Sequence, residues 1–250
     1  MADARGAQMI TGHTRLLAVI GSPVSHSLSP VIHNIFARSL ELPYAYMAFD
    51  VTPSTLGAFM DAARTLKIAG FNVTMPLKNL ISPYLAEAPG SGAAGGSVNT
   101  VALREDGGMY GISTDGDGFA ASLDAIGFDF GSGHAAVLGA GGAAAAVSAV
   151  LRARGMPVRA AARRPEAFPE LPGVTVVPWG RLREAARGAA ILVNATPLGM
   201  RGAATGAQFE SFDFLDGLPR GATVYDLIYE PPQTRLLEEA AARGLAAVNG

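Results

Sequence analysis

Short apolar runs alternate with helix-like segments along almost the whole chain, and this alternation limits the possible fold more than any other feature. The apolar runs lie at residues 16–20, 44–51, 68–73, 135–138, 158–162, 174–177, 191–194 and 223–227. Helix-like stretches lie between them, as at 30–40, 52–66, 117–126 and 142–154. Parallel strands need crossovers of this kind, so the pattern predicts an α/β fold with doubly wound, largely parallel sheets.

Turn and cap residues mark the ends of some of these elements. A glycine-containing turn at 106–108 separates strand-like runs at 98–103 and 109–112, which predicts an antiparallel hairpin. Ser29-Pro30 has the pattern of a helix N-cap followed by the first helical residue. The apolar side of the helix that follows, 30–40, has two explanations, the core or an interface, and of these we expect the core.

The composition changes at the loop 127–133, which is rich in glycine, aspartate and phenylalanine. Such a loop is typical of a domain boundary. For a chain of 250 residues we therefore expect two domains. The first is an α/β domain at 1–113, a connecting helix and linker occupy 114–128, and a Rossmann-like domain follows at 129–250.

Composition excludes several classes of protein. The sequence has no cysteine, so it forms no disulfide, thiolate metal site or cysteine nucleophile, which fits a reducing compartment. A formal net charge of -2 argues against a nucleic-acid-binding protein. The polar stretch 1–14 lacks the pattern of a signal peptide, and no apolar run approaches the length of a membrane helix. We therefore expect a cytoplasmic protein without a membrane partner.

A glycine-rich turn, Gly139-Ala140-Gly141-Gly142-Ala143, follows an apolar run and opens a helix-like stretch. Glycine permits a tight turn and the close approach of a pyrophosphate, and the helix N-terminus supplies free N–H groups. The strand–turn–helix context favours a dinucleotide site over an ordinary tight turn, which is the alternative explanation.

The end of the next apolar run separates the two nicotinamide cofactors. An NAD site usually places a carboxylate there, about 20 residues after the turn, to bind the ribose 2′-hydroxyl. Here the run ends in Ala162-Arg163-Arg164, without a carboxylate. Guanidinium groups suit a 2′-phosphate, so the sequence favours NADP, although one of the two arginines could equally be a solvated surface residue.

Polar residues stand where apolar runs end in the first half. They are Ser27, Ser29, Thr74, Lys78, Asn99 and Asp115. Ordinary explanations exist for each: Ser29 and Asp115 as helix caps, Lys78 as a surface charge. Pro76 also predicts that Lys78 lies in the first turn of a helix. A lysine with a nearby carboxylate can nevertheless transfer a proton near neutral pH, so the pair is a candidate acid/base.

Taken together, the motifs of the chain resemble those of the shikimate dehydrogenase family. The matching segments are the loop 21–30 with His33-Asn34, Asn72-Val73-Thr74-Met75-Pro76-Leu77-Lys78, Val98-Asn99-Thr100, Thr114-Asp115 with Gly118-Phe119, the turn 139–143, Asn194-Ala195-Thr196-Pro197-Leu198-Gly199-Met200, and Asp226-Leu227-Ile228-Tyr229-Glu230-Pro231 with Thr234 and Leu236-Leu237. They occur in the family's order from about residue 16 onward. No single segment is specific, but the joint match is.

The resemblance implies an NADPH-dependent, reversible reduction of 3-dehydroshikimate to shikimate in aromatic amino-acid biosynthesis, without a metal. The implied substrate contacts are Ser27 and Ser29 at the carboxylate, Thr74, Asn99 and Asp115 at the ring hydroxyls, Tyr229, and Lys78 as acid/base assisted by Asp115. The implied cofactor contacts are Gly139, Ala140, Gly141, Gly142 and Ala143 at the pyrophosphate, Arg163 and Arg164 at the 2′-phosphate, and Thr196, Leu227 and Gly250. The first domain would bind substrate, the second NADP.

The sequence departs from the family pattern in three places. Ser113 stands where an asparagine is usual, and Ala162 stands where another asparagine usually precedes the arginine. The family also continues beyond the position of Gly250 with a helix that bears a substrate-binding glutamine. We expect the chain to be shortened there, with weaker substrate binding and lower stability than a version that has the helix.

Two other functions stay open. An NAD-using quinate/shikimate dehydrogenase would be favoured by an acidic residue after the run 158–162, and none is present. A non-catalytic sensor of NADP or shikimate would have no need of the Lys78–Asp115 pair. The sequence does not distinguish a monomer from a homodimer.

Overall fold

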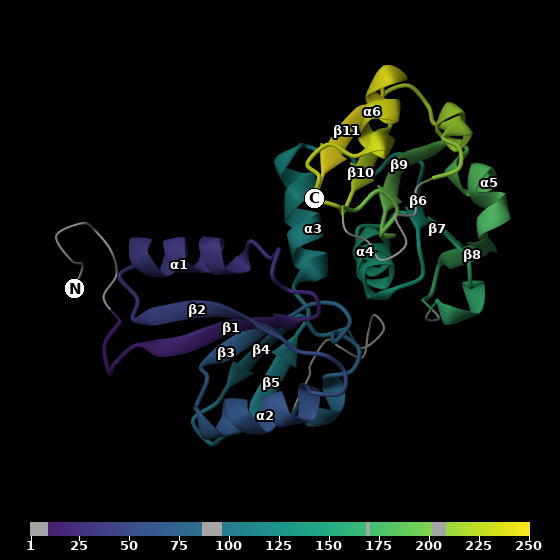
Figure 1. Cartoon of the computed structure of the whole chain (residues 1–250). Coiled ribbons are helices and arrows are strands. Elements are labelled where there is room, and N and C mark those ends of the chain that lie inside the picture. Colours follow the sequence, from purple (N-terminus) through teal and green to yellow (C-terminus); the bar gives the residue numbers. More distant parts are fainter. Residues whose placement is uncertain (1–9, 87–96, 169–170, 202–208) are drawn as a thin grey trace. The chain divides into compact units, whose positions relative to one another are not determined.

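The computed structural model describes residues 10–86, 97–168, 171–201 and 209–250. Most of the stretch 1–14, from which we inferred the absence of a signal peptide, lies outside the described residues. The chain divides into two compact units, Met1–Thr114 and Asp115–Gly250 (Figure 1). Each unit is described by itself.

A five-stranded mixed sheet forms the first unit, in the order β2-β1-β3-β4-β5. Its strands are β1 (Arg15–Gly21), β2 (Tyr44–Asp50), β3 (Gly70–Val73), β4 (Thr100–Leu103) and β5 (Met109–Ile112). β1 runs parallel to both β2 and β3, whereas β4 pairs antiparallel with β3 and β5. The β4–β5 hairpin expected from the turn at 106–108 is confirmed.

Helices cover both faces of this sheet: α1 (Ser29–Ser39) lies on one and α2 (Leu56–Thr65) on the other (Figure 1). Successive residues of β1 point to opposite faces. Ile20 packs in the cluster that contains Met60 of α2, while Val19 packs with Val24 and Tyr46 on the α1 side. Full burial of a large aliphatic side chain such as Ile20 stabilises the fold by about 1.5–3 kcal/mol.

Two expectations for this unit were wrong. No helix starts at Pro76: residues 75–80 form successive turns, with Leu77 N–H donating to the Thr74 carbonyl and Leu80 N–H to the Leu77 carbonyl. Up to residue 86, where the described stretch ends, a short 3₁₀ segment, η1 (Ser82–Tyr84), follows. On α1, only Ala37 is fully buried, and the large apolar side chains expected to face the core are exposed; they are Leu28, Val31, Ile32, Ile35, Phe36 and Leu40, from the N-cap to the C-cap.

The second unit has a six-stranded, wholly parallel sheet in the order β11-β10-β9-β6-β7-β8. Its strands are β6 (His134–Leu138), β7 (Val158–Ala162), β8 (Val174–Pro178), β9 (Ala189–Asn194), β10 (Thr223–Asp226) and β11 (Ala246–Asn249). The five strands expected from apolar runs are confirmed. β11 was missed, because its exposed alanines carry little strand signal.

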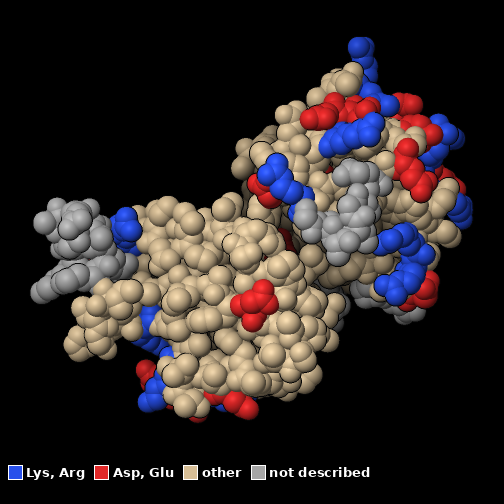
Figure 2. All heavy atoms as spheres, viewed as in Figure 1, with Lys and Arg blue, Asp and Glu red and all other residues tan. Residues whose placement is uncertain are grey.

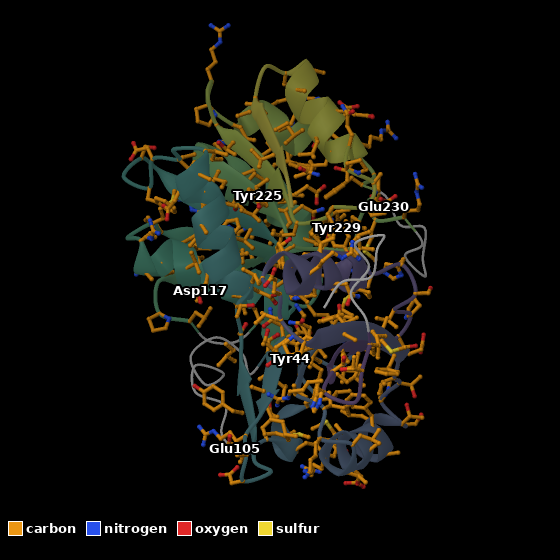
Figure 3. All side chains as sticks on the ribbon, turned by 90° about the vertical axis from the view of Figure 1, so that its left-hand side faces the viewer. Tyr44, Glu105, Asp117, Tyr225, Tyr229 and Glu230 are labelled. Carbon is orange, nitrogen blue, oxygen red and sulfur yellow. The ribbon has the colours of Figure 1, made fainter. Side chains whose placement is uncertain are left out.

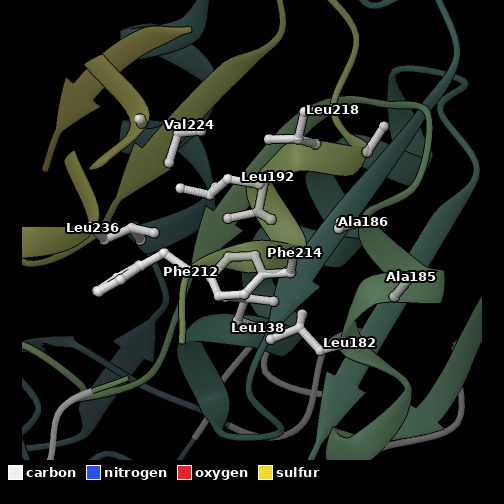
Figure 4. Packing of buried hydrophobic residues seen from close by; sticks show 14 of the residues in the cluster. Leu138, Leu182, Ala185, Ala186, Leu192, Phe212, Phe214, Leu218, Val224 and Leu236 are labelled. Carbon is white, nitrogen blue, oxygen red and sulfur yellow. The ribbon is translucent and has the colours of Figure 1, made fainter. Parts of the chain in front are cut away.

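Helices lie on both faces of this sheet, as in a doubly wound fold. The elements are α3 (Asp115–Ala125), α4 (Gly142–Ala153), α5 (Leu182–Ala186) and α6 (Arg235–Ala242), with 3₁₀ segments η2 (Pro165–Ala167), η3 (Trp179–Arg181) and η4 (Asp213–Gly217). α3 and α4 share one buried cluster with the sheet; α5 and α6 share the other, in which Leu192 and Phe214 pack together (Figure 4). No helix within the described residues is long and apolar enough to cross a membrane.

Candidate active site

The carboxyl ends of β1 and β3 meet in the first unit and bring two of the predicted loops together. Ser22 N–H donates to the Met75 carbonyl at 3.1 Å, and Thr74 N–H donates to the Ile20 carbonyl at 2.9 Å. A Cβ at Gly21 would collide with the Thr74 side chain. Glycine is therefore required there for the loop that leads to Ser27 to pass beside Thr74.

Ser27 and Ser29 lie half-buried at the start of α1. The N-cap position belongs to Leu28, and no side chain caps this helix, so Ser29 does not serve as the cap. The Ser27 Oγ accepts a hydrogen bond from Ser29 N–H at 3.3 Å. Two hydroxyls at a helix N-terminus are suited to bind a carboxylate. The free N–H groups and the positive end of the helix dipole at the same place also favour a negatively charged group.

Lys78 and Asn99 are held side by side through the backbone. Val98 N–H donates to the Lys78 carbonyl at 3.0 Å, an interaction that replaces the one a regular helix would make. The Asn99 Oδ1 accepts from Thr114 N–H at 3.0 Å, and its Nδ2 donates to the Thr114 Oγ1 at 3.0 Å. Lys78 is half-buried, so its aliphatic stem is packed and its position is restricted.

Two predicted substrate residues belong to the second unit. Asp115 directly follows Thr114 in the chain and is the first residue of α3. Tyr229 is exposed on the loop after β10, in contrast to Tyr225, which is buried in β10 against Phe119 (Figure 3).

The glycine-rich turn has the geometry of a dinucleotide cradle. Gly139 has φ +118°, and a Cβ there would lie 2.9 Å from the Ala195 carbonyl oxygen. Gly141 is the N-cap of α4, with no side-chain cap, and a Cβ there would point into open space. The first-turn N–H groups of α4 have no partner within the helix, so a pyrophosphate fits beside them.

Arg163 and Arg164 lie exposed immediately after β7, next to the strand that precedes this turn. No carboxylate occurs in the segment 160–165. The donor set therefore fits a 2′-phosphate and lacks the group that would bind a free 2′-hydroxyl. The remaining predicted cofactor residues lie at the same carboxyl edge of the sheet: Thr196 follows β9, Leu227 follows β10 and Gly250 follows β11.

Gly250 and Leu227 are in close contact, because a Cβ at Gly250 would lie 2.7 Å from the Leu227 carbonyl oxygen. The sequence named both as cofactor residues, and the structure brings them together. Thr196 is similarly placed against the glycine-rich turn: its Cγ2 would lie 3.3 Å from a Cβ at Gly139.

A buried polar cluster that the sequence analysis missed fixes the loops after β9 and β10. The Asp226 carboxylate is 0% exposed and accepts from Asn194 Nδ2 at 2.9 Å, Thr234 Oγ1 at 2.6 Å and Ile228 N–H at 3.1 Å. The Asn194 Oδ1 accepts from Thr196 N–H and Oγ1. Burial raises the pKa of Asp226, against the lowering effect of these donors. Asp226 and Asn194 belong to segments that resemble the family, but a sequence motif does not show which of its residues are buried.

Comparison with known proteins shows to which family this chain belongs. Residues 19–101 match the family model described as the shikimate dehydrogenase substrate binding domain. The shikimate dehydrogenase (NADP(+)) of Rubrobacter xylanophilus is 44% identical over 252 residues, covering 96% of this chain and 87% of the relative. The chain belongs to the shikimate dehydrogenase family.

Solved structures of family members have the same fold. A Thermus thermophilus shikimate 5-dehydrogenase in complex with NADP(H) and shikimate is 35% identical and has a TM-score of 0.79, covering 94% of this chain and 86% of that one. Shikimate dehydrogenase 1 from Peptoclostridium difficile has a TM-score of 0.85 at 28% identity, covering 95% and 86%. The α/β architecture expected from the sequence, with a Rossmann-like second half, is confirmed.

Proposed function

We propose that this protein catalyses the NADPH-dependent, reversible reduction of 3-dehydroshikimate to shikimate, a step of aromatic amino-acid biosynthesis. The observation that carries the proposal is the family relationship over 96% of the chain. The geometry of the candidate site supports the proposal. Val98 N–H binds the Lys78 carbonyl and so places Lys78 near Asn99, the residue after Val98. A glycine-rich turn and two exposed arginines lie at the carboxyl edge of the second sheet.

The substrate contacts follow from the chemistry of each side chain. Ser27 and Ser29, at the N-terminus of α1, bind the carboxylate. Thr74, Asn99 and Asp115 bind the ring hydroxyls, because each can accept or donate a hydrogen bond to a hydroxyl. Tyr229 reaches the substrate from the second unit.

Lys78 acts as the acid/base of the reaction. When bound, NADPH supplies a hydride to the C3 carbonyl carbon. The Lys78 Nζ donates a proton to the oxygen that becomes the hydroxyl, and in the reverse direction it removes that proton. Asp115 assists Lys78 in this assignment. A positioned acid of this kind contributes about 10²–10⁴-fold to the rate.

The second unit holds the cofactor. The turn residues Gly139, Ala140, Gly141, Gly142 and Ala143 bind the pyrophosphate, Arg163 and Arg164 bind the 2′-phosphate, and Thr196, Leu227 and Gly250 lie toward the nicotinamide. In this assignment 1–113 is the substrate-binding and catalytic domain, 114–128 the connecting helix and linker, and 129–250 the NADP domain.

Two functions compete with this one. An NAD-using quinate/shikimate dehydrogenase is disfavoured by the arginines and the missing carboxylate after β7. A non-catalytic sensor is disfavoured because the relatives compared here carry the name of an NADP-dependent enzyme. All three are separated by one assay, in which shikimate oxidation is followed by the absorbance of the reduced nicotinamide with NADP and NAD in parallel.

The expected result is turnover with NADP and much weaker turnover with NAD. Replacing both arginines, as in R163A/R164A, should raise the KM for NADP and leave the KM for NAD nearly unchanged. Faster turnover with NAD would favour the quinate/shikimate alternative. Binding of shikimate and NADP without turnover would favour the sensor.

We also propose that the protein works in the cytoplasm, as a monomer or homodimer. The lack of cysteine is in keeping with a reducing compartment. Sedimentation velocity would distinguish the two assembly states, and a larger oligomer would contradict both.

A further inference from the structure

A chain of hydrogen bonds crosses the first sheet on its α1 side and passes through Tyr46 of β2. This tyrosine is 5% exposed, and its hydroxyl donates to the Asn72 Oδ1 of β3 at 2.6 Å. β1 lies between these two strands, pairing with Tyr46 at Leu17 and with Asn72 at Val19. Burial raises the pKa of Tyr46, and the Ser29 side chain, acting as a hydrogen-bonding group, opposes this rise.

The direction of each bond in this chain is determined by its neighbours. Asn72 Nδ2 donates to the Asn99 carbonyl at 3.2 Å and to the Thr100 Oγ1 at 3.1 Å, so its Oδ1 must be the acceptor for Tyr46. Tyr46 has a single proton and gives it to Asn72, so toward Ser29 the Tyr46 oxygen can act only as an acceptor.

The chain ends at the side chain of Asn99. Thr100 Oγ1 donates to the Asn99 Oδ1 at 3.0 Å, and Thr114 N–H donates to the same oxygen. Because this oxygen accepts from two directions, the amide is held with its N–H groups as the end that can meet a ligand. Ser29 and Asn99, the two ends of the chain, are both assigned to substrate above.

Two residues of α1 hold Tyr46 in place. β2 is an edge strand, so one side of its backbone has no neighbouring strand. Asn34 binds this side of the β2 backbone as a neighbouring strand would. Its Oδ1 accepts from Tyr46 N–H and its Nδ2 donates to the Tyr46 carbonyl, each at 2.9 Å. The His33 ring stacks on the tyrosine ring at 4.3 Å. α1, and with it Ser29, is thereby fixed to Tyr46.

We propose that Tyr46 and Asn72 are positioning residues that set the Ser29 hydroxyl and the Asn99 amide together, so that the carboxylate and hydroxyl contacts of the substrate are oriented as one unit. The proposal rests on the proposed function. Without the Tyr46 hydroxyl, Asn72 loses its donor and can turn, Thr100 loses its fixed partner, and Ser29 loses its acceptor.

Steady-state kinetics of Tyr46→Phe test this directly. The KM for shikimate should rise about five- to tenfold, the size expected for losing an oriented hydrogen bond, while kcat and the KM for NADP change less than about twofold. Tyr44→Phe is the matched control, since it removes a hydroxyl from the same strand but from outside the chain, and it should match the wild type.

A double variant shows whether Tyr46 acts through Ser29. If it does, Tyr46→Phe should raise the KM for shikimate much less in a Ser29→Ala background than in the wild type. Fully multiplicative effects would overturn the link to Ser29. If Tyr46→Phe does not fold, Thr100→Val breaks the same chain at its other end and should raise the KM for shikimate in the same way.

The outcomes separate this inference from the proposed function. A wild type that does not oxidise shikimate would refute the function. An active wild type for which Tyr46→Phe lowers only the melting temperature, with the KM for shikimate unchanged, would leave the function intact and show that Tyr46 is merely structural.

Discussion

The two units build their binding sites from different materials. In the first, the site consists of side chains on loops and strand ends, tied by solvent-accessible hydrogen bonds such as that of Asn99 with Thr114. In the second, the cradle is backbone, a glycine turn and a helix N-terminus, while the buried Asp226 cluster fixes the loops after β9 and β10. In the view of Figure 2, the charged side chains also gather mainly on the second unit.

The difference follows from what each unit has to bind. A ring with several hydroxyls and a carboxylate needs donors and acceptors at many separate places, which side chains supply. A pyrophosphate needs several N–H groups at one place, which a helix N-terminus supplies. Substitutions in the first unit should therefore act mainly on ligand binding, whereas those in the second can also disturb the backbone that forms the cradle.

The largest stability effect should come from truncating the buried cluster. Asp226→Ala leaves the Asn194 amide, the Thr234 hydroxyl and Ile228 N–H without their acceptor, and should lower the free energy of unfolding by about 3 kcal/mol or more. Asn72→Ala, in the half-buried network of the first unit, should cost about 1 kcal/mol, because water can replace its partners. Urea denaturation measures the free energy of unfolding of both variants. Equal losses in the two variants would contradict the difference between the units.

Two substitutions in the glycine-rich turn should distinguish the effect of backbone strain on stability from the effect of a lost contact on cofactor binding. Gly139→Ala introduces a Cβ at φ +118°, 2.9 Å from the Ala195 carbonyl oxygen, and should destabilise the fold by about 1–3 kcal/mol. Gly141→Ala is the control: its Cβ meets nothing within 4 Å, so the melting temperature should stay unchanged. Both should raise the KM for NADP. A Gly141→Ala variant that binds NADP normally would show that the pyrophosphate does not approach this turn.

A smaller effect should appear in the pH dependence of stability. Burial raises the pKa of Asp226 above its ordinary value of 3.8, so the folded state keeps this proton to higher pH than the unfolded state. The contribution of Asp226 to the free energy of unfolding therefore falls as pH rises from the unfolded to the folded pKa, and is constant above it.

The Asp226→Asn variant has no titratable group at this position, so its free energy of unfolding should not fall over this pH range for that reason. Its Oδ1 can still accept from Asn194 and Ile228, and Thr234 can accept from its Nδ2, so the variant should fold. Urea denaturation between about pH 4 and pH 7 should show Asp226→Asn gaining stability relative to the wild type as pH rises. A difference independent of pH would mean that the pKa of Asp226 is not raised.

The smallest effect should come from an exposed ion pair of the second unit. Arg154 donates two hydrogen bonds to the Asp124 carboxylate, at 2.8 and 2.6 Å, and they lower the pKa of that carboxyl. Both residues are exposed, so Arg154→Ala should change the melting temperature only slightly, with any loss complete above the unfolded pKa of Asp124 and vanishing as pH falls through its folded pKa. A large loss, or one that persists in acid, would contradict this.

The sequence predicted the repeating parts of the fold better than the irregular ones. Buried strands such as β6 are continuous apolar runs, and the glycine turn has a composition that few other structures need. The turns at 75–80 could not be predicted, because Pro76 suits a turn as well as a helix start and the choice depends on the hydrogen bond from Val98 to Lys78. β11 was missed because its mostly exposed residues carry little strand signal and its place in the sheet depends on pairing with β10.

The candidate site shows the same limit. Motifs named Lys78, Asn99 and the glycine turn, because the chemistry of these residues is visible in their type and spacing. They gave no sign that Tyr46 contacts Asn72 across an intervening strand, since the two residues are separated by 26 positions. Neither did they show which carboxylate of the second half is buried, because burial depends on the packing of β9, β10 and α6 around Asp226.

In the proposed reaction Lys78 transfers the proton, and the kinetics of Lys78→Met test this role most directly. Methionine keeps most of the packed aliphatic stem and removes the amine. The only other lysine, the exposed Lys67, provides the control as Lys67→Met. We predict that kcat for shikimate oxidation falls about 10²–10⁴-fold in Lys78→Met, far more than the KM for shikimate rises, and is unchanged in Lys67→Met. A near-normal kcat in Lys78→Met would contradict the account.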